Sequence, residues 1–430
     1  MYSGGDDVSS IVLDVGTSTV KGGYAGEDSP KAIFPTDIGV VFTAGTDEST
    51  VGVNQQAIGE SEEPDPAAKR TYYVGTNAVT YKRPHMHIQS PLQDGLIKDW
   101  DAMEHIWNHA FRYRLNTNPN EHPILLAEPS FNTKQIREKM SEIMFEKYHT
   151  PALFLSKNAV LTAFASCKAS ALVMDSGGGM TSVVPVHDGY VIKNAITKSN
   201  LAGNRLTDEY YRILSQKNIR INPHNLIKKV EVKQGEYSVT NIDIPDLTES
   251  YKKYVSMEIV RDLKETSFRV SNGQVGEDLH IATVPYELPD GNLLEVGSDR
   301  FQVPENMFNP TPLNEQQEGS NHRYVPLPKM IYESVEKCDT DIRRELIANL
   351  IISGGNSLFQ GFSDRLYMEL GDLSASFGKV KFVVPNVNER KYGVWIGGSI
   401  LGSLGTFQQM WMSKSEWEEY GRPLVEKKCP

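Results

Sequence analysis

An apolar run that ends in an aspartate and then turns on glycine occurs twice in this chain. Residues 11–21 read IVLDVGTSTVK, and residues 171–184 read ALVMDSGGGMTSVV. Each run predicts a buried strand, a tight turn and a return strand, which together form a β-hairpin. Asp14 and Asp175 lie 161 positions apart, far beyond the roughly 20–50 residues of a solenoid repeat. The spacing therefore predicts a duplicated domain in which each half presents one hairpin.

Between the hairpins, apolar residues recur at helical spacing. We expect one helix capped by Asp99 and another capped by Asn132 or Thr133. A third helix is expected over residues 249–270. The apolar faces of the first two helices consist of Met103, Ile106, Trp107, Ala110 and Phe111, and of Ile136, Met140, Ile143 and Met144. Strands that alternate with helices favour an α/β architecture.

Three stretches interrupt this pattern, at residues 42–70, 228–246 and 304–328. They are polar or rich in glycine and proline and show little periodicity. Loops of such length inside a compact protein are usually functional or disordered. We therefore expect insertions or mobile loops at these three places.

Acidic residues outnumber basic ones by 55 to 44, which gives a net charge of −11. Direct binding of duplex nucleic acid relies on clustered Lys and Arg, so we expect any such contact to run through a partner protein. The sequence has no secretory signal and no stretch approaching the ~20 apolar residues of a membrane helix. Its three cysteines are widely spaced and form no CxxC pair, which favours a reducing compartment.

Both hairpins carry groups that bind phosphate. Glycine turns let backbone N–H groups approach an anion, and Thr17 and Lys21 add donors. Asp14 and Asp175 can hold a divalent cation, directly or through water. An ordinary Asp-Gly turn is the plain alternative, but two copies after buried strands favour a triphosphate clamp. A third glycine turn, at residues 354–356, follows another apolar strand and can receive a nucleoside.

Longer segments resemble the actin family. They are YAGED (24–28), MDSG (174–177), LAG (201–203), EIVRDLKE (258–265), VWIGGSIL (394–401), SLGTFQQMW (403–411) and KKCP (427–430). The resemblance implies an α/β, actin-like fold in which two duplicated, ribonuclease-H-like domains enclose a nucleotide cleft. One half is expected at residues 1–165 plus 393–430, with the variable loop 42–70. The other is expected at residues 166–392, with insertions near 228–246 and 304–328.

Within that family, the acidic N-terminal extension and the segments HPILLAE (122–128), FLSK (154–157) and VLTAFA (160–165) resemble one nuclear branch of the actin-related proteins. This resemblance implies a non-catalytic scaffold subunit of chromatin-remodelling and histone-acetyltransferase complexes in the nucleus. Such a subunit would dock on an amphipathic helix of a remodelling ATPase beside actin and would contact chromatin indirectly. A cytoskeletal, filament-forming ATPase is the alternative. The actin-type C-terminus argues against a sugar kinase or a chaperone ATPase.

The resemblance to actins also assigns a site for ATP or ADP with Mg²⁺ or Ca²⁺. Asp14 and Asp175 would hold the metal ion through water. The residues that match the family's phosphate, ribose and base pockets are Asp14, Gly16, Thr17, Ser18, Lys21, Asp175, Gly177, Gly178, Gly179, Gly203, Lys264, Glu265, Gly354, Gly355, Asn356, Phe359 and Lys391.

Five positions depart from the family's hydrolytic pattern, so no catalytic residue is expected. Asn158 stands where the family has a Gln that positions the attacking water, and its side chain is one methylene shorter. Ser182 replaces a His and Gly178 replaces an Asp. Ser18 replaces a Gly, and Asp94 stands where most actins have a His. These departures predict nucleotide binding with weak or absent hydrolysis, the nucleotide acting as a structural wedge.

Two surface features bear on assembly. The loop 42–70 and the stretch 304–328 depart from actin, and a filament needs a repeated heterologous contact, so we expect no homopolymer. The family's helix-binding groove maps onto Phe164, Ala169, Ile400, Leu401, Leu404 and Phe407. Helical periodicity taken alone would instead make these residues part of the core.

Overall fold

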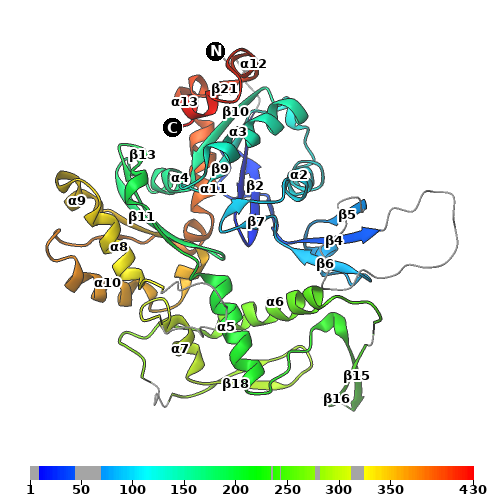
Figure 1. Cartoon of the computed structure of the whole chain (residues 1–430). Helices are drawn as coiled ribbons and strands as arrows, with labels where there is room; N and C mark the ends of the chain where they lie inside the picture. The colour runs from blue at the N-terminus through cyan, green and yellow to red at the C-terminus, as the bar shows by residue number, and fades with distance from the viewer. Residues whose placement is uncertain (1–8, 44–68, 234–235, 243, 277–280, 311–323) are drawn as a thin grey trace, which may run out of the picture.

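Two six-stranded sheets form the centre of the computed structural model, which describes residues 9–43, 69–233, 236–242, 244–276, 281–310 and 324–430 (Figure 1). The first sheet has the order β21-β10-β9-β1-β2-β3, and the second has the order β13-β12-β11-β19-β20, with β14 beside β12. The strands of the first sheet are β1 (Ile11–Val15), β2 (Thr19–Tyr24), β3 (Ala32–Pro35), β9 (Ile124–Glu128), β10 (Ala152–Lys157) and β21 (Met412–Ser413). Those of the second are β11 (Ala171–Ser176), β12 (Thr181–His187), β13 (Tyr190–Val191), β14 (Thr197–Ser199), β19 (Leu350–Ser353) and β20 (Phe382–Val383).

Both sheets have the same connectivity. In the first, β1, β2 and β3 pair antiparallel, and β9 and β10 add in parallel on the other side of β1. In the second, β11, β12 and β14 pair antiparallel, and β19 and β20 add in parallel on the other side of β11. The predicted duplication is therefore present in the fold, and the hairpins β1–β2 and β11–β12 occupy equivalent places. The residue boundaries of the two halves stay a prediction.

Helices and small sheets surround these two sheets. The helices are α1 (Thr76–Thr80), α2 (Trp100–Asn108), α3 (Lys134–Glu142), α4 (Asn158–Ala165), α5 (Gly203–Gln216), α6 (Glu249–Ser267), α7 (Asp299–Glu305), α8 (Leu327–Glu336), α9 (Thr340–Ile347), α10 (Phe362–Leu373), α11 (Val387–Ser403), α12 (Lys414–Tyr420) and α13 (Leu424–Lys428). The small sheets pair β4 (Ile38–Thr43) with β5 (Lys69–Tyr73) and β6 (Met86–Gln89), β7 (Leu92–Gln93) with β8 (Leu96–Ile97), β15 (Ile227–Lys233) with β16 (Glu236–Asn241), and β17 (Val284–Glu287) with β18 (Leu293–Val296). Within the described residues, no helix combines the length and apolar character needed to span a bilayer.

The capped helices form as predicted from their sequences. At the start of α2, the Asp99 carboxylate accepts a hydrogen bond from the Ala102 amide at 3.0 Å. Of the two candidate caps for α3, Thr133 is the one used. The third helix, α6, ends at Ser267 rather than at residue 270, because Phe268 is extended and buries its ring in the core of the second half.

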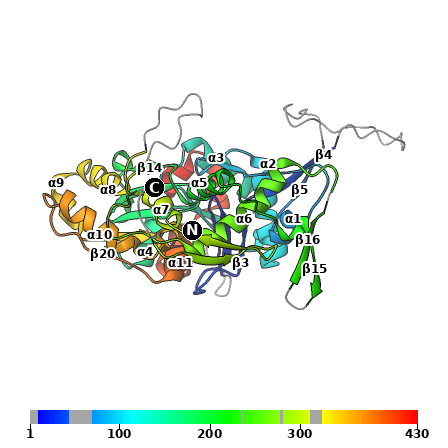
Figure 2. The same ribbon diagram turned by 90° about the horizontal axis from the view of Figure 1, so that it is seen from below.

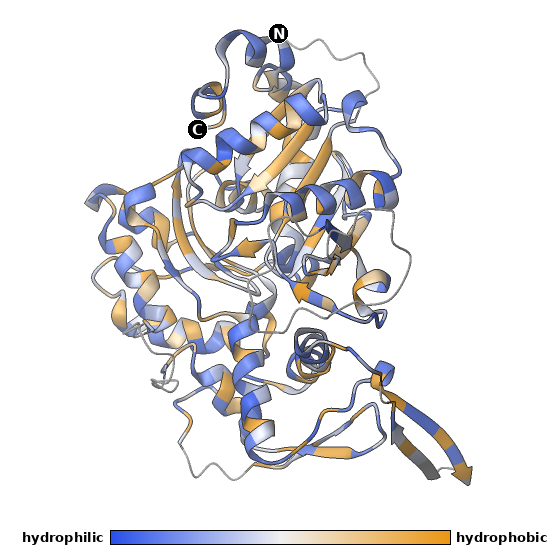
Figure 3. Cartoon of the chain, turned by 45° about the vertical axis from the view of Figure 1, so that its right-hand side comes forward, coloured by the Kyte–Doolittle hydropathy of each residue, from blue (hydrophilic) through white to orange (hydrophobic). Residues whose placement is uncertain are grey.

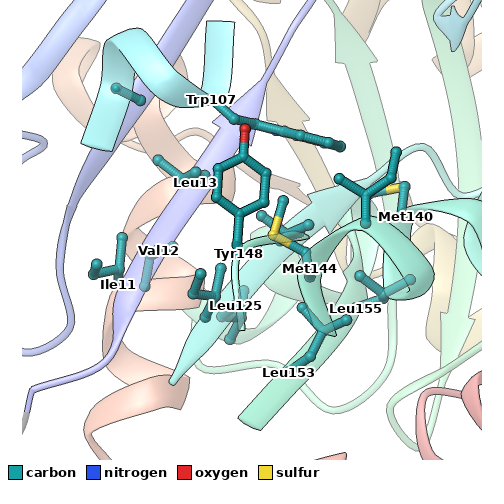
Figure 4. Packing of buried hydrophobic residues seen from close by; sticks show 14 of the residues in the cluster. Ile11, Val12, Leu13, Trp107, Leu125, Met140, Met144, Tyr148, Leu153 and Leu155 are labelled. Atoms are coloured by element: carbon teal, nitrogen blue, oxygen red, sulfur yellow. The ribbon is translucent and has the colours of Figure 1, made fainter. Parts of the chain in front are cut away.

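The core of the first half is built on both faces of its sheet. Leu13 and Leu155 share one face with Trp107 of α2 and Met140 of α3 (Figure 4). On the opposite face, Val12 packs against α11. Figure 3 shows the result in both halves, with hydrophobic strands inside and helices that turn hydrophilic sides outward. Burial on both faces explains why β1, β9 and β10 read as nearly continuous apolar runs.

Helices α4 and α11 connect the two halves, because both pack on strands of both sheets (Figure 1). Their backbones approach closely at glycine. A Cβ atom built on Gly397 would lie 1.9 Å from the Leu161 carbonyl oxygen, and one built on Gly398 would lie 2.7 Å from Val12 Cγ1. Glycine is therefore required at these positions by space, and the two helices form the hinge side of the molecule.

The three irregular stretches have different outcomes. Residues 44–68 and 311–323 lie outside the described residues, so the expectations for these parts stay predictions. The stretch 228–246 was expected to be an insertion or a mobile loop, and most of it is a regular hairpin rather than a loop. It forms the hairpin β15–β16, which projects from the body of the molecule in Figures 1 and 2. Its strands alternate charged and apolar residues around a two-stranded ribbon, so no continuous apolar run marks them in the sequence.

Candidate functional site

A cavity of about 550 Å³ lies between the two hairpins and is lined by residues from both halves. Every residue that the family resemblance assigned to the nucleotide site lines it. Asn158 and Ser182, two of the positions that depart from the hydrolytic pattern, line it as well. Asp94 does not. It is exposed and accepts a hydrogen bond from Asn200 Nδ2 at 2.9 Å, so its inclusion among the groups around the reaction centre was wrong.

The two hairpins turn in the same way. The Gly16 amide donates to the Thr19 carbonyl at 3.1 Å, and the Gly177 amide donates to the Met180 carbonyl at 3.0 Å. Each turn is also held from outside. The Thr36 hydroxyl donates to the Gly16 carbonyl at 2.6 Å, and the Gly203 amide donates to the Gly177 carbonyl at 3.0 Å. These bonds hold both glycine turns rigidly on either side of the cavity.

The charged groups at the hairpin ends are arranged around the cavity. Lys21 Nζ lies 3.0 Å from Asp14 Oδ2, so these two side chains form an ion pair. Burial raises the pKa of Asp175 to about 6; the nearby Asp14 carboxylate adds to the rise, and Lys21 opposes it. An ionised Asp175 is therefore disfavoured unless a further positive charge is present. A divalent cation would supply that charge.

The donor set suits a cation that keeps most of its shell for water and phosphate. Among the described residues, no three His, Cys, Asp or Glu side chains cluster into a metal site. Asp14 and Asp175 are two carboxylates that face one cavity. Mg²⁺ in nucleotide sites is commonly held by one or two carboxylates together with substrate phosphates and water. The residues present thus fit the expected metal–nucleotide pair.

The nucleoside end of the cavity has an open acceptor. Asn356 is 7% exposed, and its Nδ2 donates to Ser176 Oγ at 3.0 Å. Its Oδ1 is buried and has no hydrogen-bond partner. Beside it, Gly354 has a φ of +90°, and a Cβ atom there would lie 2.1 Å from the Ser176 carbonyl oxygen. A buried acceptor without a partner costs stability, so it favours a ligand donor such as a ribose hydroxyl.

Lys264 spans from α6 to the second hairpin. Its ammonium donates to the Gly203 carbonyl at 2.7 Å, and burial lowers the pKa of Lys264 to about 8. Its neighbour Glu265 also lines the cavity. The lysine therefore remains charged at neutral pH and adds positive potential close to the second glycine turn.

Asn158, at the start of α4, is held by neighbouring donors. Its Oδ1 accepts hydrogen bonds from the Ser130 hydroxyl at 2.7 Å, from the Ser130 amide at 3.2 Å and from the Ala159 amide at 2.8 Å. An amide oxygen has two lone pairs, so these three donors saturate it. The Asn158 oxygen consequently has no capacity left to accept a hydrogen bond from a water molecule in the cavity.

Sequence reasoning missed several polar residues of the cavity, among them Arg261, Arg390 and Asn204. Arg261 lies one helical turn before Lys264, and Arg390 precedes Lys391, so both are adjacent to assigned residues. Asn204 follows Gly203 and accepts a hydrogen bond from Ser18 Oγ at 3.2 Å. Arg261 belongs to one of the segments that resembles actins. That segment, together with proximity to assigned residues, was the available signal.

The expected helix-binding groove is only partly exposed. Ile400 and Leu404 are each 38% exposed, Ala169 is exposed, and Phe164 and Leu401 are half-buried. Phe407 is 5% exposed and packs edge-on against Phe154 at 4.8 Å between ring centroids. Its assignment to the groove surface was therefore wrong. It lies in the core of the first half, where three aromatic rings meet.

The far side of the cleft from α4 and α11 is closed by a contact that we call the clasp. It joins α1 and β6 of the first half to the start of α6 in the second. Its buried residues are Val79, Met86, Leu247, Tyr251, Tyr254 and Val255. The Tyr251 hydroxyl donates to the Thr80 carbonyl at 2.6 Å, and the Ile88 amide donates to Ser250 Oγ at 3.1 Å. The clasp thus combines apolar burial with hydrogen bonds between the halves.

Duplicated sheets, paired glycine turns and a shared cavity define a class of two-lobed nucleotide-binding proteins. A family model described as Actin matches residues 5–430 of this chain, so the chain belongs to the actin family. It is an actin-related protein: it is 47% identical to Actin-related protein 4 of Arabidopsis thaliana over 444 residues, and 47% identical over 446 residues to those of Oryza sativa subsp. indica and subsp. japonica. Each comparison covers 100% of both chains. Membership of the actin family implies nucleotide binding.

Proposed function

We propose that this protein is a non-catalytic, actin-related scaffold subunit of nuclear chromatin-remodelling and histone-acetyltransferase complexes. It binds ATP or ADP with Mg²⁺ or Ca²⁺ as a structural element between its halves. It docks beside actin on an amphipathic helix of a remodelling ATPase. Full-length similarity to Actin-related protein 4 and the departures from actin at residues 158, 178 and 182 support this role.

The state of Asn158 carries the proposal. A hydrolytic water must be held in line with the γ-phosphate, and a displacement of about 1 Å costs on the order of a hundredfold in rate. The Asn158 oxygen is taken by Ser130 and Ala159. Ser182 and Gly178 add no imidazole and no carboxylate to the same cavity. These features support nucleotide binding without efficient activation of water.

The test combines binding with turnover. Isothermal titration with Mg-ATP should give saturable binding, and a phosphate-release assay at saturating ATP should give turnover roughly a hundredfold or more below that of conventional actin under the same conditions. The double variant Asn158→Gln/Ser182→His should raise the rate. Actin-like turnover by the unchanged protein would contradict the non-catalytic role. Absence of binding would contradict the structural role of the nucleotide.

The scaffold part is tested separately. Affinity purification of the tagged protein from nuclear extract should recover actin and a remodelling ATPase, identified by mass spectrometry. Recovery of neither partner, from an extract that contains both, would remove the support for this role. A homopolymer detected by sedimentation would instead favour the cytoskeletal alternative.

A further inference from the structure

The tips of the two hairpins touch across the cavity, and a residue on one tip is matched to a residue on the other. A Cβ atom built on Gly178 would lie 1.9 Å from Ser18 Oγ and 3.0 Å from Ser18 Cβ. Gly178 does not adopt a positive φ, so its backbone conformation does not require glycine. Space restricts the position instead, because a Cβ atom on residue 178 would force the Ser18 hydroxyl to rotate away from its observed place.

A set of hydrogen bonds fixes this arrangement. Ser18 Oγ donates to Asn204 Oδ1 at 3.2 Å, which joins the first hairpin to the start of α5. The Asn204 amide donates to the Gly178 carbonyl at 2.7 Å, which joins α5 to the second hairpin. Ser18, Asn204 and Gly178 therefore form a closed ring of contacts that spans the two halves. We call this ring the interlock.

The charge around the cavity bears on what the interlock does. Five basic and four acidic side chains line the cavity, namely Lys21, Arg261, Lys264, Arg390 and Lys391, and Asp14, Glu128, Asp175 and Glu265. A carboxylate at position 178 would cancel the basic excess. Glycine at this position keeps a further carboxylate away from the two glycine turns, where Lys21 and Lys264 supply the positive charge that attracts a polyphosphate.

We propose that the interlock sets the spacing of the two phosphate-binding hairpins, and that Ser18 and Gly178 together make the cleft accept a nucleoside polyphosphate with little dependence on a divalent cation. Ser18 takes the space that a carboxylate side chain on residue 178 would need. Its hydrogen bond to Asn204 keeps the two hairpins at a fixed distance from each other. The cation requirement is lowered because the cavity keeps its basic excess. The inference about the cation rests on the nucleotide binding proposed above, whereas the inference that the interlock sets the hairpin spacing does not.

The interlock is tested by a double-mutant cycle on thermal stability with no nucleotide present. Gly178→Ala adds only a Cβ atom, which forces the Ser18 hydroxyl away from Asn204. It should lower the Tm by about 2 °C when Ser18 is present, the effect of roughly one lost hydrogen bond in a chain of this size. In the Ser18→Gly background the same change should have almost no effect, because the space is free.

Gly405→Ala is the matched control, since a Cβ atom at Gly405 meets nothing within 4 Å. Its effect should be the same with Ser18 and with Ser18→Gly. Additive effects of Ser18→Gly and Gly178→Ala would overturn the interlock, whatever the protein binds.

The cation requirement is tested by titrating ATP into the full chain in Mg²⁺ and in EDTA. The Kd of the unchanged protein should differ by less than about tenfold between the two conditions. The exchange variant Ser18→Gly/Gly178→Asp keeps the space filled but adds a carboxylate. The ratio of its Kd in EDTA to its Kd in Mg²⁺ should exceed that of the unchanged protein by on the order of tenfold. Equal ratios for the two proteins would overturn the cation claim. Failure of both to bind ATP in Mg²⁺ would instead contradict the proposed nucleotide function, and the stability cycle would still decide the interlock.

Discussion

Asp175 is the residue at which folding and ligand binding oppose each other. Its carboxylate is buried and faces Asp14, and its pKa is raised to about 6 from an ordinary value of 3.8. The folded protein therefore binds this proton more tightly than the unfolded chain does. As pH rises through the window from about 4 to about 6, ionisation of Asp175 lowers the free energy of unfolding. A bound cation reverses the effect by pairing with the charge.

Asp175→Asn should therefore raise the Tm at pH 7.5 when no nucleotide is added, because the amide carries no buried charge. At pH 5, inside this window, the gain should be about half as large. The same variant should lose the part of the ATP-induced rise in Tm that depends on Mg²⁺. Thermal melts at the two pH values, without nucleotide, with Mg-ATP and with ATP in EDTA, measure all three effects. Asp28→Asn, at an exposed position, is the control, and a lower Tm for Asp175→Asn at pH 7.5 would contradict the interpretation.

At this scale the sequence located most of the residues that line the cavity, because each glycine turn is formed by residues that are adjacent in the chain. Gly16 and Gly177 could be found from their own hairpins. Asn204 could not be found in this way, because it lines the cavity while bonded to Ser18, which is 186 positions away. Asp94 and Phe407 were misplaced for the same reason: whether a side chain faces a cavity, solvent or core is decided by residues that are distant in sequence.

At the scale of elements, the sequence predicted the features that depend on short-range interactions. The caps of α2 and α3 are short-range hydrogen bonds, so Asp99 and Thr133 were readable from the sequence. The end of α6 was not, because tertiary burial of Phe268 decides it. The clasp was not predicted at all. It joins the short elements α1 and β6, which carry Val79 and Met86, to α6. Neither sequence segment indicates that it contacts the other.

The clasp should control how fast nucleotide leaves. Tyr251→Phe removes the hydroxyl that donates to Thr80 and accepts from Asn225 Nδ2 at 3.0 Å. The loss should cost about 1 kcal/mol and so speed release of a fluorescent ATP analogue by about fivefold. A chase experiment with excess ATP measures the rate. Tyr190→Phe removes the hydroxyl of a tyrosine that is 62% exposed and should leave the rate unchanged. An unaltered rate in Tyr251→Phe would show that exchange does not require the clasp to open.

At the scale of the whole molecule, the expected helix-binding groove rests on the apolar surface at the end of α11. Ile400 and Leu404 present exposed apolar surface there, and each lies near the end of α11. An amphipathic helix can bury such side chains at its i, i+3, i+4 and i+7 positions. The exposed part of the groove is smaller than the sequence suggested, because Phe407 lies beneath it.

Leu404→Asp should remove the protein from the proposed complex without unfolding it. A carboxylate buried and unpaired on binding costs several kcal/mol, which corresponds to about a thousandfold loss of affinity. Co-precipitation with the remodelling ATPase measures the loss, and a melting curve verifies folding. Leu373→Asp makes the same change on α10, at a side chain that is 46% exposed, and should co-precipitate normally. Normal co-precipitation of Leu404→Asp would place the docking site elsewhere.

The position of α4 and α11 also determines how strongly contacts elsewhere in the molecule resist opening of the cleft. Both helices pack on strands of both sheets, so they form the connection about which the halves would turn if the cleft opened. Residues of α11 and of α6 near Lys264 line the cavity, and Tyr254 in the clasp lies about 15 Å farther along α6, at 1.5 Å per residue. Contacts at the clasp therefore act on a longer arm than contacts at the phosphates. A few modest bonds at the rim can exert as much torque against opening as stronger bonds nearer the axis.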